Sequence, residues 1–244
     1  MKSIKTVHLT EIDSTNKYAK NLSFSNIELP VVIYADSQSE GRGRLGRTFV
    51  SNKGKGIYMS ILFKSYFDIS EISRITAYTS TIVSSVIDNL TGVSTKIKWV
   101  NDIYLNDKKL CGILTESIIK NDDCYIIVGI GLNVLKQEFD DKLKDIVTTL
   151  EDETNIKYDI NSIIEAISVS FFDNIDQIKT KEYIKDYKSK SIVIGKNVEV
   201  KLPNEVIYGK AIDIDDDGEL VVSNNSNIHK IYSGEITKLC ICDE

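Results

Sequence analysis

The sequence is poor in the residues that most often build metal sites and disulfide frameworks. Among its 244 residues there are two histidines, His8 and His229, and four cysteines, none of which forms a C-x-x-C pair. Nucleophilic catalysis by histidine, a multi-histidine metal site and a disulfide framework are therefore disfavoured. Thiols that stay free fit a reducing compartment, so we predict a cytoplasmic location.

Long apolar stretches and an excess of positive charge are also missing. No apolar run approaches the roughly 18 residues that a membrane helix needs, and the first residues, MKSIKTVHLTEID, lack the apolar segment of a signal peptide. The formal net charge is −6 and the pI is near 5.2. Since an acidic chain offers no general basic surface, we predict neither a nucleic-acid partner nor a membrane partner.

The spacing of apolar residues predicts an α+β fold, because strands repeat with a period near two residues and helices with a period near 3.6. The predicted strands lie at 5–9, 30–36, 56–63, 94–100, 102–106, 109–119 and 124–134. A first helix is predicted through about Leu22, with N-cap chemistry offered by Asp13, Ser14 and Thr15. Two more are predicted over 72–90, after a capping box at Asp68 and Glu71, and over about 160–178. These elements indicate a mixed or antiparallel central sheet with flanking helices.

From about Ser191 the predicted strands become short, and Pro-Asn, Asp-Gly and Asn-Asn turns separate them. This pattern is typical of a small SH3-like β-barrel. We therefore predict two domains, residues 1–189 and residues 190–244. We interpret the acidic run Asp215–Asp217, which precedes a glycine, as a hairpin turn, because it lacks the ligand spacing and terminal glutamate of a calcium-binding loop.

The stretch GRGRLGR at 41–47 places three arginines and three glycines in an acidic chain. It matches G-x-G-x-x-G, but a strand follows instead of the helix that a dinucleotide fold requires, and no kinase-type V-A-I-K strand is present. A nucleic-acid segment fits poorly because no aromatic residues are interleaved. A solvated loop and a small-anion site stay open, and the glycines favour the anion site, since a plain loop does not need them.

Candidate partners for an anion site occur at turns and strand ends. Lys98, Asn101, Asp102 and Lys109 surround one predicted turn. Asn133 ends a strand that contains Gly129 and Gly131, the D-S-T-N segment offers hydroxyl and amide groups, and Gln38 precedes the arginine loop. Local chemistry does not distinguish Lys109 from Lys108, and Ser14 and Thr15 could simply cap a helix.

With these segments in view, the sequence resembles the biotin protein ligases. The matching segments stand in the family's order: D-S-T-N at 13–16, Q-S-E-G-R-G-R-L-G-R at 38–47, K-W-V-N-D at 98–102, K-K-L-C-G-I-L at 108–114 and G-I-G-L-N-V at 129–134. The resemblance covers about residues 5–134 through these motifs. The C-terminal module is similar to that of the family only in its character and its position in the chain. The family's DNA-binding winged helix has no counterpart here, so we expect no repressor role.

The resemblance implies a two-step reaction that uses ATP, Mg²⁺ and biotin. The biotin carboxylate attacks the α-phosphate of MgATP to give biotinyl-5′-AMP, and a lysine of a biotin carboxyl carrier protein then takes the biotin. It assigns catalysis to Lys109, Arg42 and Arg44. It assigns biotin binding to Ser14, Thr15, Asn16, Gln38, Gly41, Arg42, Gly43, Arg44, Lys109, Gly112, Gly129 and Gly131. It assigns ATP or adenylate binding to Arg42, Arg44, Arg47, Asn101, Asp102, Lys109 and Asn133.

Within that assignment, Ser14, Thr15 and Gln38 are expected to hold the ureido head of biotin. Mg²⁺ is expected to arrive with ATP, with Asp102 as a candidate ligand, and Trp99 is expected to pack in the core. The glycine-rich loop is expected to become ordered when ligand binds. Three positions depart from the usual pattern, Phe49, Val100 and Cys111, but all keep an apolar side chain.

Two other functions stay open. A lipoate ligase or octanoyltransferase shares the fold and the acyl-carrier logic, although the arginine-rich loop favours biotin. A non-catalytic module that binds biotin or a nucleotide would use the same polar residues without forming an adenylate. A homodimer through the central sheet rests on analogy alone.

Overall fold

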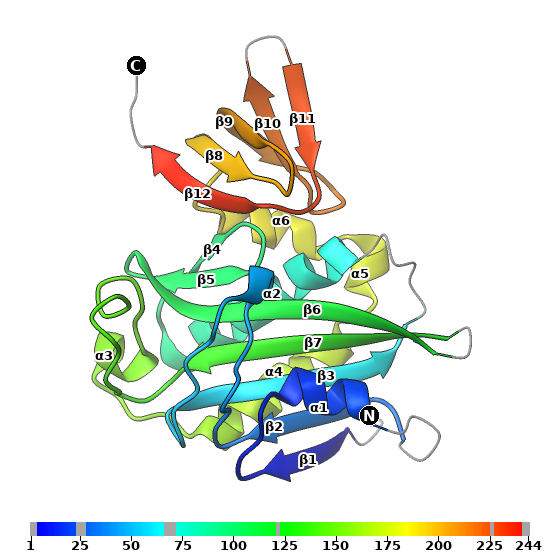
Figure 1. Cartoon of the computed structure of the whole chain (residues 1–244), viewed down its shortest axis with the longest axis vertical. Coiled ribbons are helices and arrows are strands. Elements are labelled where there is room, and N and C mark those ends of the chain that lie inside the picture. The colour runs from blue at the N-terminus through cyan, green and yellow to red at the C-terminus, as the bar shows by residue number, and fades with distance from the viewer. Residues whose placement is uncertain (1–3, 23–27, 66–71, 121–122, 225–226, 241–244) are drawn as a thin grey trace.

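The fold is built on a seven-stranded sheet, seen in a computed structural model that describes residues 4–22, 28–65, 72–120, 123–224 and 227–240 (Figure 1). The sheet has the order β1-β2-β3-β7-β6-β5-β4. Its strands are β1 (Lys5–Leu9), β2 (Val31–Ala35), β3 (Gly56–Lys64), β4 (Lys96–Lys98), β5 (Asp102–Leu105), β6 (Lys108–Lys120) and β7 (Asp123–Asn133). Only the β1–β2 pair is parallel, which confirms the predicted mixed sheet.

The predicted strand at 94–100 is too long, because only Lys96–Lys98 forms β4. The chain turns back after Lys98, and Lys98 pairs with Asp102 in a short hairpin. The next turn forms as predicted. Asn106 and Asp107 both have positive φ, at 48° and 64°, as a tight hairpin between β5 and β6 requires.

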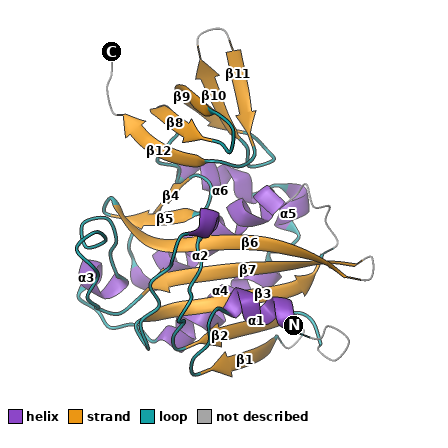
Figure 2. Ribbon diagram, in the orientation of Figure 1, coloured by secondary structure: helices purple, strands orange, loops and turns teal. Residues whose placement is uncertain are grey.

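Helices cover the two faces of the sheet unequally (Figure 2). They are α1 (Thr15–Asn21), α2 (Ile72–Thr91), α3 (Leu150–Thr154), α4 (Ile160–Asp173), α5 (Gln177–Thr180) and α6 (Tyr183–Ser189). Helices α2 and α4 pack together on one face and bury the main core, whereas α1 alone covers part of the other face. Strand β3 is buried from Gly56 to Phe63 because it lies between these layers, which explains its continuous apolar sequence.

The prediction of one helix over 160–178 is wrong. Helix α4 ends at Asp173, where Asn174 leaves the helical backbone conformation and its side-chain amide donates a hydrogen bond to the Ser170 carbonyl. A separate short helix, α5, then buries Ile178. Helices α3 and α6 were not predicted, since five and seven residues carry too little periodicity. The capping box at Asp68 and Glu71 lies outside the described residues.

The C-terminal strands form a separate antiparallel sheet of order β11-β10-β9-β8-β12. They are β8 (Asn197–Lys201), β9 (Val206–Ile214), β10 (Leu220–Asn224), β11 (Asn227–Ile231) and β12 (Glu235–Cys240). This confirms the predicted small β module, although β12 was missed. Of residues 235–239 only Ile236 is buried, so this stretch shows no apolar alternation.

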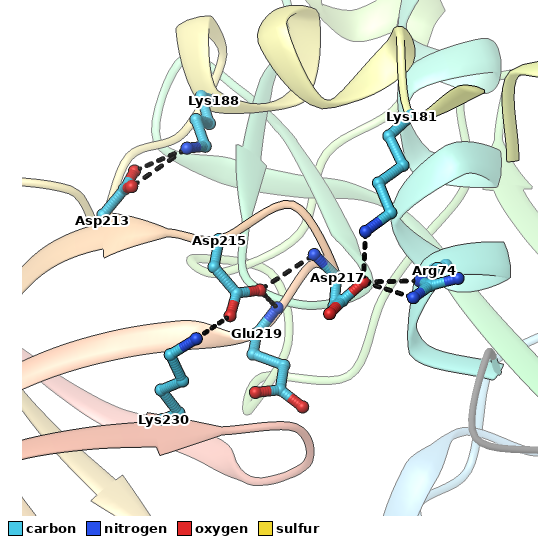
Figure 3. A network of polar contacts seen from close by, with 8 residues as sticks. All are labelled: Arg74, Lys181, Lys188, Asp213, Asp215, Asp217, Glu219 and Lys230. Carbon is cyan, nitrogen blue, oxygen red and sulfur yellow. Dashed lines mark hydrogen bonds and ion pairs between the residues drawn. The ribbon is translucent and has the colours of Figure 1, made fainter. Parts of the chain in front are cut away.

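The acidic run forms the β9–β10 hairpin turn, as predicted. Side chains of this hairpin also form ion pairs with residues in or at the ends of the helices next to the large sheet (Figure 3). Asp217 accepts hydrogen bonds from Lys181 Nζ and from Arg74 Nε, both at 2.8 Å, and these contacts hold the pKa of its carboxyl below the usual range. Lys188 pairs with Asp213 at 2.9 Å. Single exposed pairs contribute little, but the same turn also makes a buried contact, because the Gly218 carbonyl accepts a hydrogen bond from Trp99 Nε1, 3.0 Å long.

Among the described helices none is long and apolar enough to cross a membrane. Within the described ranges, the Leu29–Pro30 and Trp99–Val100 peptide bonds are cis.

Candidate active site

A cavity of about 520 Å³ lies where α1, the glycine-arginine loop, the β4–β5 hairpin and strands β6 and β7 meet. It brings together residues from distant parts of the chain. The sequence-predicted residues that line it are Ser14, Thr15, Asn16, Gln38, Arg42, Gly43, Arg44, Arg47, Asn101, Asp102, Lys109, Gly112, Gly129, Gly131 and Asn133. Trp99 also lines the cavity, although it is only 3% exposed and belongs to the core as expected.

Gly41 is the one predicted site residue that does not line the cavity. A Cβ atom at this position would lie 2.3 Å from the Phe49 carbonyl oxygen and 2.6 Å from Ser51 Oγ. The Phe49 amide donates to the Gly41 carbonyl at 2.9 Å. Gly41 therefore closes the base of the loop through its backbone.

One end of the cavity is neutral and tightly hydrogen-bonded. Ser14 caps α1, and its side chain accepts from the Lys17 amide. The Thr15 amide donates to Gln38 Oε1 at 2.8 Å, and Gln38 Nε2 donates to Ser51 Oγ at 3.0 Å. Ser14, Thr15 and Asn16 are each less than 5% exposed. The helix cap and the start of the glycine-arginine loop are thus fixed to each other.

The two glycines of β7 make this packing possible. A Cβ at Gly129 would lie 2.4 Å from Asn16 Oδ1, and a Cβ at Gly131 would lie 2.7 Å from the Phe49 ring. The sequence left open whether these glycines serve ligand approach or sheet packing. In the structure their closest partners are side chains of the protein that themselves shape the cavity.

The opposite end of the cavity is charged. Lys109 Nζ lies 2.8 Å from Asp102 Oδ1, and the Asn101 amide donates to that oxygen at 3.0 Å. Arg44 Nη1 donates to Asn101 Oδ1 at 3.2 Å. A Cβ at Gly112 would lie 3.4 Å from Lys109 Nζ, so the small residue leaves room for the amine. Lys108 is not among the lining residues, which distinguishes the two neighbouring lysines where the sequence did not.

Burial affects two cations at this end. It lowers the pKa of Lys98 and the pKa of Arg44. Nearby carboxylates oppose the effect, above all Asp102 and then Glu235. Poorly hydrated cations of this kind are ready to bind an anion, because less water must be removed when it arrives.

The glycine-arginine loop lies over the charged end and contacts the C-terminal module. Its tip is a short 3₁₀ turn, η2 (Arg44–Gly46), in which Leu45 has φ 55°. Arg44 Nη2 donates to Ser233 Oγ at 3.2 Å, and Arg47 pairs with Glu235. Arg42 lies 3.8 Å from Glu40. The loop therefore reaches residues almost 190 positions further along the chain.

Sequence reasoning missed two parts of the cavity wall. The first is Gly234, just before β12, and Glu235, its first residue, which no local pattern marks. The second is an apolar group formed by Phe139, Leu143, Ile146 and Val147. That segment runs beside Lys109, whose amide donates to the Ile146 carbonyl at 2.9 Å and whose carbonyl accepts from the Thr148 amide at 3.0 Å. Its sequence has neither helical nor strand periodicity, so only the fold reveals it.

No group of three or more metal-ligating side chains occurs in the part of the chain that the structure describes. The carboxylates that line the cavity are Asp102 and Glu235, and both already contact cations. This donor set does not hold a divalent cation by itself. It does fit Mg²⁺ bound chiefly through substrate phosphates, which is the usual way that proteins use this ion.

A neutral hydrogen-bonding end, a cationic end and a lysine paired with a carboxylate suit an enzyme that activates a carboxylate and transfers an acyl group. Residues 9–133 match the Biotin/lipoate A/B protein ligase family, and residues 193–239 match the Biotin protein ligase C terminal domain. The chain belongs to the biotin/lipoate A/B protein ligase family, in its biotin protein ligase branch.

Individual relatives support the same conclusion. The chain is 35% identical to the bifunctional ligase/repressor BirA of Bacillus subtilis, over 92% of this chain and 71% of that protein. It is 27% identical to the biotin–[acetyl-CoA-carboxylase] ligase of Mycobacterium tuberculosis, over 86% of this chain and 79% of that protein. Among solved structures, biotin protein ligase from Aquifex aeolicus in complex with biotin and ATP matches with a TM-score of 0.82 and 30% identity, over 96% of this chain and 97% of that one.

Proposed function

We propose that this protein is a biotin protein ligase, which converts biotin and MgATP into biotinyl-5′-AMP and transfers biotin to a lysine of a biotin carboxyl carrier protein. The observation that carries the proposal is the polarity of one cavity. Its neutral end offers hydroxyl and amide groups, which suit the ureido head of biotin. Its other end offers cations, which suit a carboxylate and phosphates. Family membership agrees with this assignment.

The first step joins two anions, so it needs charge neutralisation and alignment. A carboxylate oxygen of biotin attacks the α-phosphorus of ATP, and the bond from that phosphorus to pyrophosphate breaks. Lys109 lines the charged end of the cavity, where its Nζ lies 2.8 Å from Asp102. Its ammonium group stabilises the negative charge of the transition state, and its hydrogen bond to Asp102 fixes its direction.

The arginines of the loop complete the charged end. Arg44 and Arg42 are assigned to the carboxylate and the α-phosphate, and Arg47 holds the loop against Glu235. Asn133, 4% exposed at the end of β7, is assigned to the adenine ring. Asn101 positions Arg44. Mg²⁺ neutralises phosphate charge when it is bound, and Asp102 is the residue assigned to contact it.

In the second step the carrier lysine amine attacks the acyl carbon of the mixed anhydride. The bond between that carbon and the phosphate oxygen breaks, AMP leaves, and the new amide nitrogen loses a proton. The loop over the cavity retains the reactive adenylate until the carrier arrives and keeps water away from it.

The decisive experiment supplies MgATP and a purified carrier domain, with either biotin or lipoate. The proposal predicts a mass increase of the carrier by one biotinyl group and no lipoylation. Transfer of lipoate but not biotin would instead establish the second candidate, a lipoate ligase. Saturable biotin binding without release of pyrophosphate would establish a non-catalytic binding module.

The cellular location, the partners and the oligomeric state of the enzyme belong to the same proposal. We assign it to the cytoplasm, where ATP and carboxylase carriers occur, and Cys111 and Cys124 are free thiols that agree with a reducing compartment. We expect neither nucleic acid nor membrane among its partners. Whether it forms a homodimer is tested by its mass in solution.

A further inference from the structure

Lys98 is a cation in the wall of the cavity whose charge has no acceptor. It is the last residue of β4, it is half-buried, and it lines the cavity. Its ammonium group makes neither an ion pair nor a hydrogen bond with any residue that the structure describes. Its Nζ lies over the Tyr104 ring, 6.0 Å from the centroid. A cation–π contact at this distance is weak and supplies no hydrogen-bond acceptor.

The other cations of the cavity wall differ from Lys98 in this respect. All four contact oxygen acceptors of the protein; they are Arg42, Arg44, Arg47 and Lys109. The two carboxylates that line the cavity, Asp102 and Glu235, are already engaged in these contacts. Taking an ammonium group out of water without a partner is unfavourable, and burial accordingly lowers the pKa of Lys98. A ligand with negative charge supplies the missing partner when it binds.

Lys98 lies within electrostatic reach of both Lys109 and the contact between the loop and the C-terminal module. Asp102 has the largest influence on its charge, followed by Glu235, Lys109 and Arg47. Glu235 is the first residue of β12 and pairs with Arg47, whereas Lys109 belongs to β6. An extended anion such as a triphosphate can therefore contact Lys109 with one phosphate group and Lys98 with another.

The proposed first step leaves part of ATP without a protein partner, because Lys109, Arg42 and Arg44 are assigned to the biotin carboxylate and the α-phosphate. We propose that Lys98 binds the leaving group, so that its ammonium contacts the β- and γ-phosphates of ATP. A biotin carboxylate oxygen bonds to the α-phosphorus, the bond from that phosphorus to the bridging oxygen breaks, and its electron pair stays on pyrophosphate. Lys98 stays protonated and stabilises the charge that forms there. This inference rests on the proposed function.

The main test compares the two half-reactions in Lys98→Met, which keeps the length of the side chain and removes its charge. Pyrophosphate takes part only in the first half-reaction. We expect kcat/KM for ATP in pyrophosphate release to fall at least about 10-fold, as when a hydrogen bond to a charged group is lost, with the KM for biotin within about 2-fold of wild type. Transfer from supplied biotinyl-5′-AMP to the carrier should stay within about 2-fold of the wild-type rate.

Inhibition by the two small products separates the phosphate groups of ATP. AMP carries only the α-phosphate, whereas magnesium pyrophosphate carries the other two, and the formation of biotinyl-5′-AMP is followed in the presence of each. In Lys98→Met the Ki of pyrophosphate should rise at least about 10-fold, and the Ki of AMP should change by less than about 2-fold. Lys98→Arg should lose less pyrophosphate affinity than Lys98→Met, because it keeps the positive charge.

Lys96→Met is the matched control, since Lys96 lies on the same strand but is exposed and does not line the cavity. It should leave every parameter at the wild-type value. A kcat/KM for ATP or a Ki for pyrophosphate within about 2-fold of wild type in Lys98→Met overturns the inference. An equal loss in both half-reactions also overturns it, because Lys98 would then support Asp102 and Lys109 instead. A wild type that releases no pyrophosphate with biotin and MgATP would refute the proposed function itself.

Discussion

The two ends of the cavity are built in contrasting ways. At the neutral end, Ser14, Thr15 and Asn16 are buried, and hydrogen bonds link Thr15 to Gln38 and Ser60 and link Asn16 to Ser60. At the charged end, by contrast, Arg42 and Arg47 are exposed and Arg44 is half-buried. Arg42 contacts Glu40 in the loop, and the partners of Arg44 and Arg47 come from the C-terminal module and from the β4–β5 hairpin.

This difference separates recognition from retention. A buried, fully hydrogen-bonded end is fixed before ligand arrives, so it can discriminate by leaving wrong ligands with unsatisfied groups. An end assembled from exposed contacts across two sheets can open and close at small cost. We therefore expect substitutions at the neutral end to change biotin affinity, and substitutions in the loop to change how long the adenylate stays bound.

The largest effect should come from Lys109, at the charged end of the cavity. Lys109→Ala removes the ammonium group that stabilises the transition state and leaves Asp102 unpaired. We expect kcat for adenylation to fall by about 10²- to 10³-fold, with a smaller change in biotin affinity. Pyrophosphate release measures kcat for adenylation, and calorimetry measures the affinity for biotin. Lys108→Ala, outside the cavity, is the control, and an equal loss in both variants would refute the assignment.

Adding one methyl group at each end of the cavity, by a glycine-to-alanine substitution, tests the contrast between the two ends. In Gly129→Ala the new Cβ would lie 2.4 Å from Asn16 Oδ1, so the neutral end must distort. Overpacking of this kind costs about 1–3 kcal/mol, which corresponds to a rise of about 5- to 150-fold in the Kd for biotin. In Gly43→Ala the nearest atom is 3.6 Å away and φ is −108°, so we expect less than a 3-fold change. Equal effects would remove the contrast between the ends.

The loop variant should act on retention. Arg44→Gly loses the contacts to Asn101 and Ser233, so biotinyl-5′-AMP should escape about 10-fold faster and label lysines of bystander proteins. Western blotting with streptavidin after incubation with albumin measures this labelling. Leu45→Gly gives the same loop a glycine without removing a polar contact. Labelling confined to the carrier in Arg44→Gly, or equal leakage from Leu45→Gly, would contradict the role of Arg44.

The smallest effect is expected at the contact between the loop and the C-terminal module. Glu235→Gln weakens the pair with Arg47, and because Arg47 is exposed we expect adenylate release to rise only about 2- to 5-fold at low salt. The difference from wild type should vanish near 1 M salt, where charges are screened. Glu205→Gln, in the same module, should match wild type at every salt concentration. A salt-independent effect of Glu235→Gln would argue against a charge contact.

Sequence periodicity was sufficient to predict the elements that bury a long regular face, such as α2 and β3. Turn-forming residues were sufficient to predict the turns at Asp107 and Gly218. It failed where a short segment buries one residue, as in β12, or where an asparagine ends a helix inside an apolar pattern, as at Asn174. Most candidate site residues could be named because they lie in short motifs. Ser233 and Glu235 could not, since their proximity to the loop depends on how two sheets pack.

Hydrogen exchange of the wild-type protein tests the contrast between the two ends most directly. The reporters are the Tyr18 amide, bonded to the Ser14 carbonyl at 2.8 Å, and the Gly43 amide, bonded to the Arg47 carbonyl at 2.7 Å. We predict that biotin and MgATP slow exchange at Gly43 at least about 10-fold and change exchange at Tyr18 by less than about 3-fold. A Gly43 amide that is equally protected with and without ligand would contradict the account.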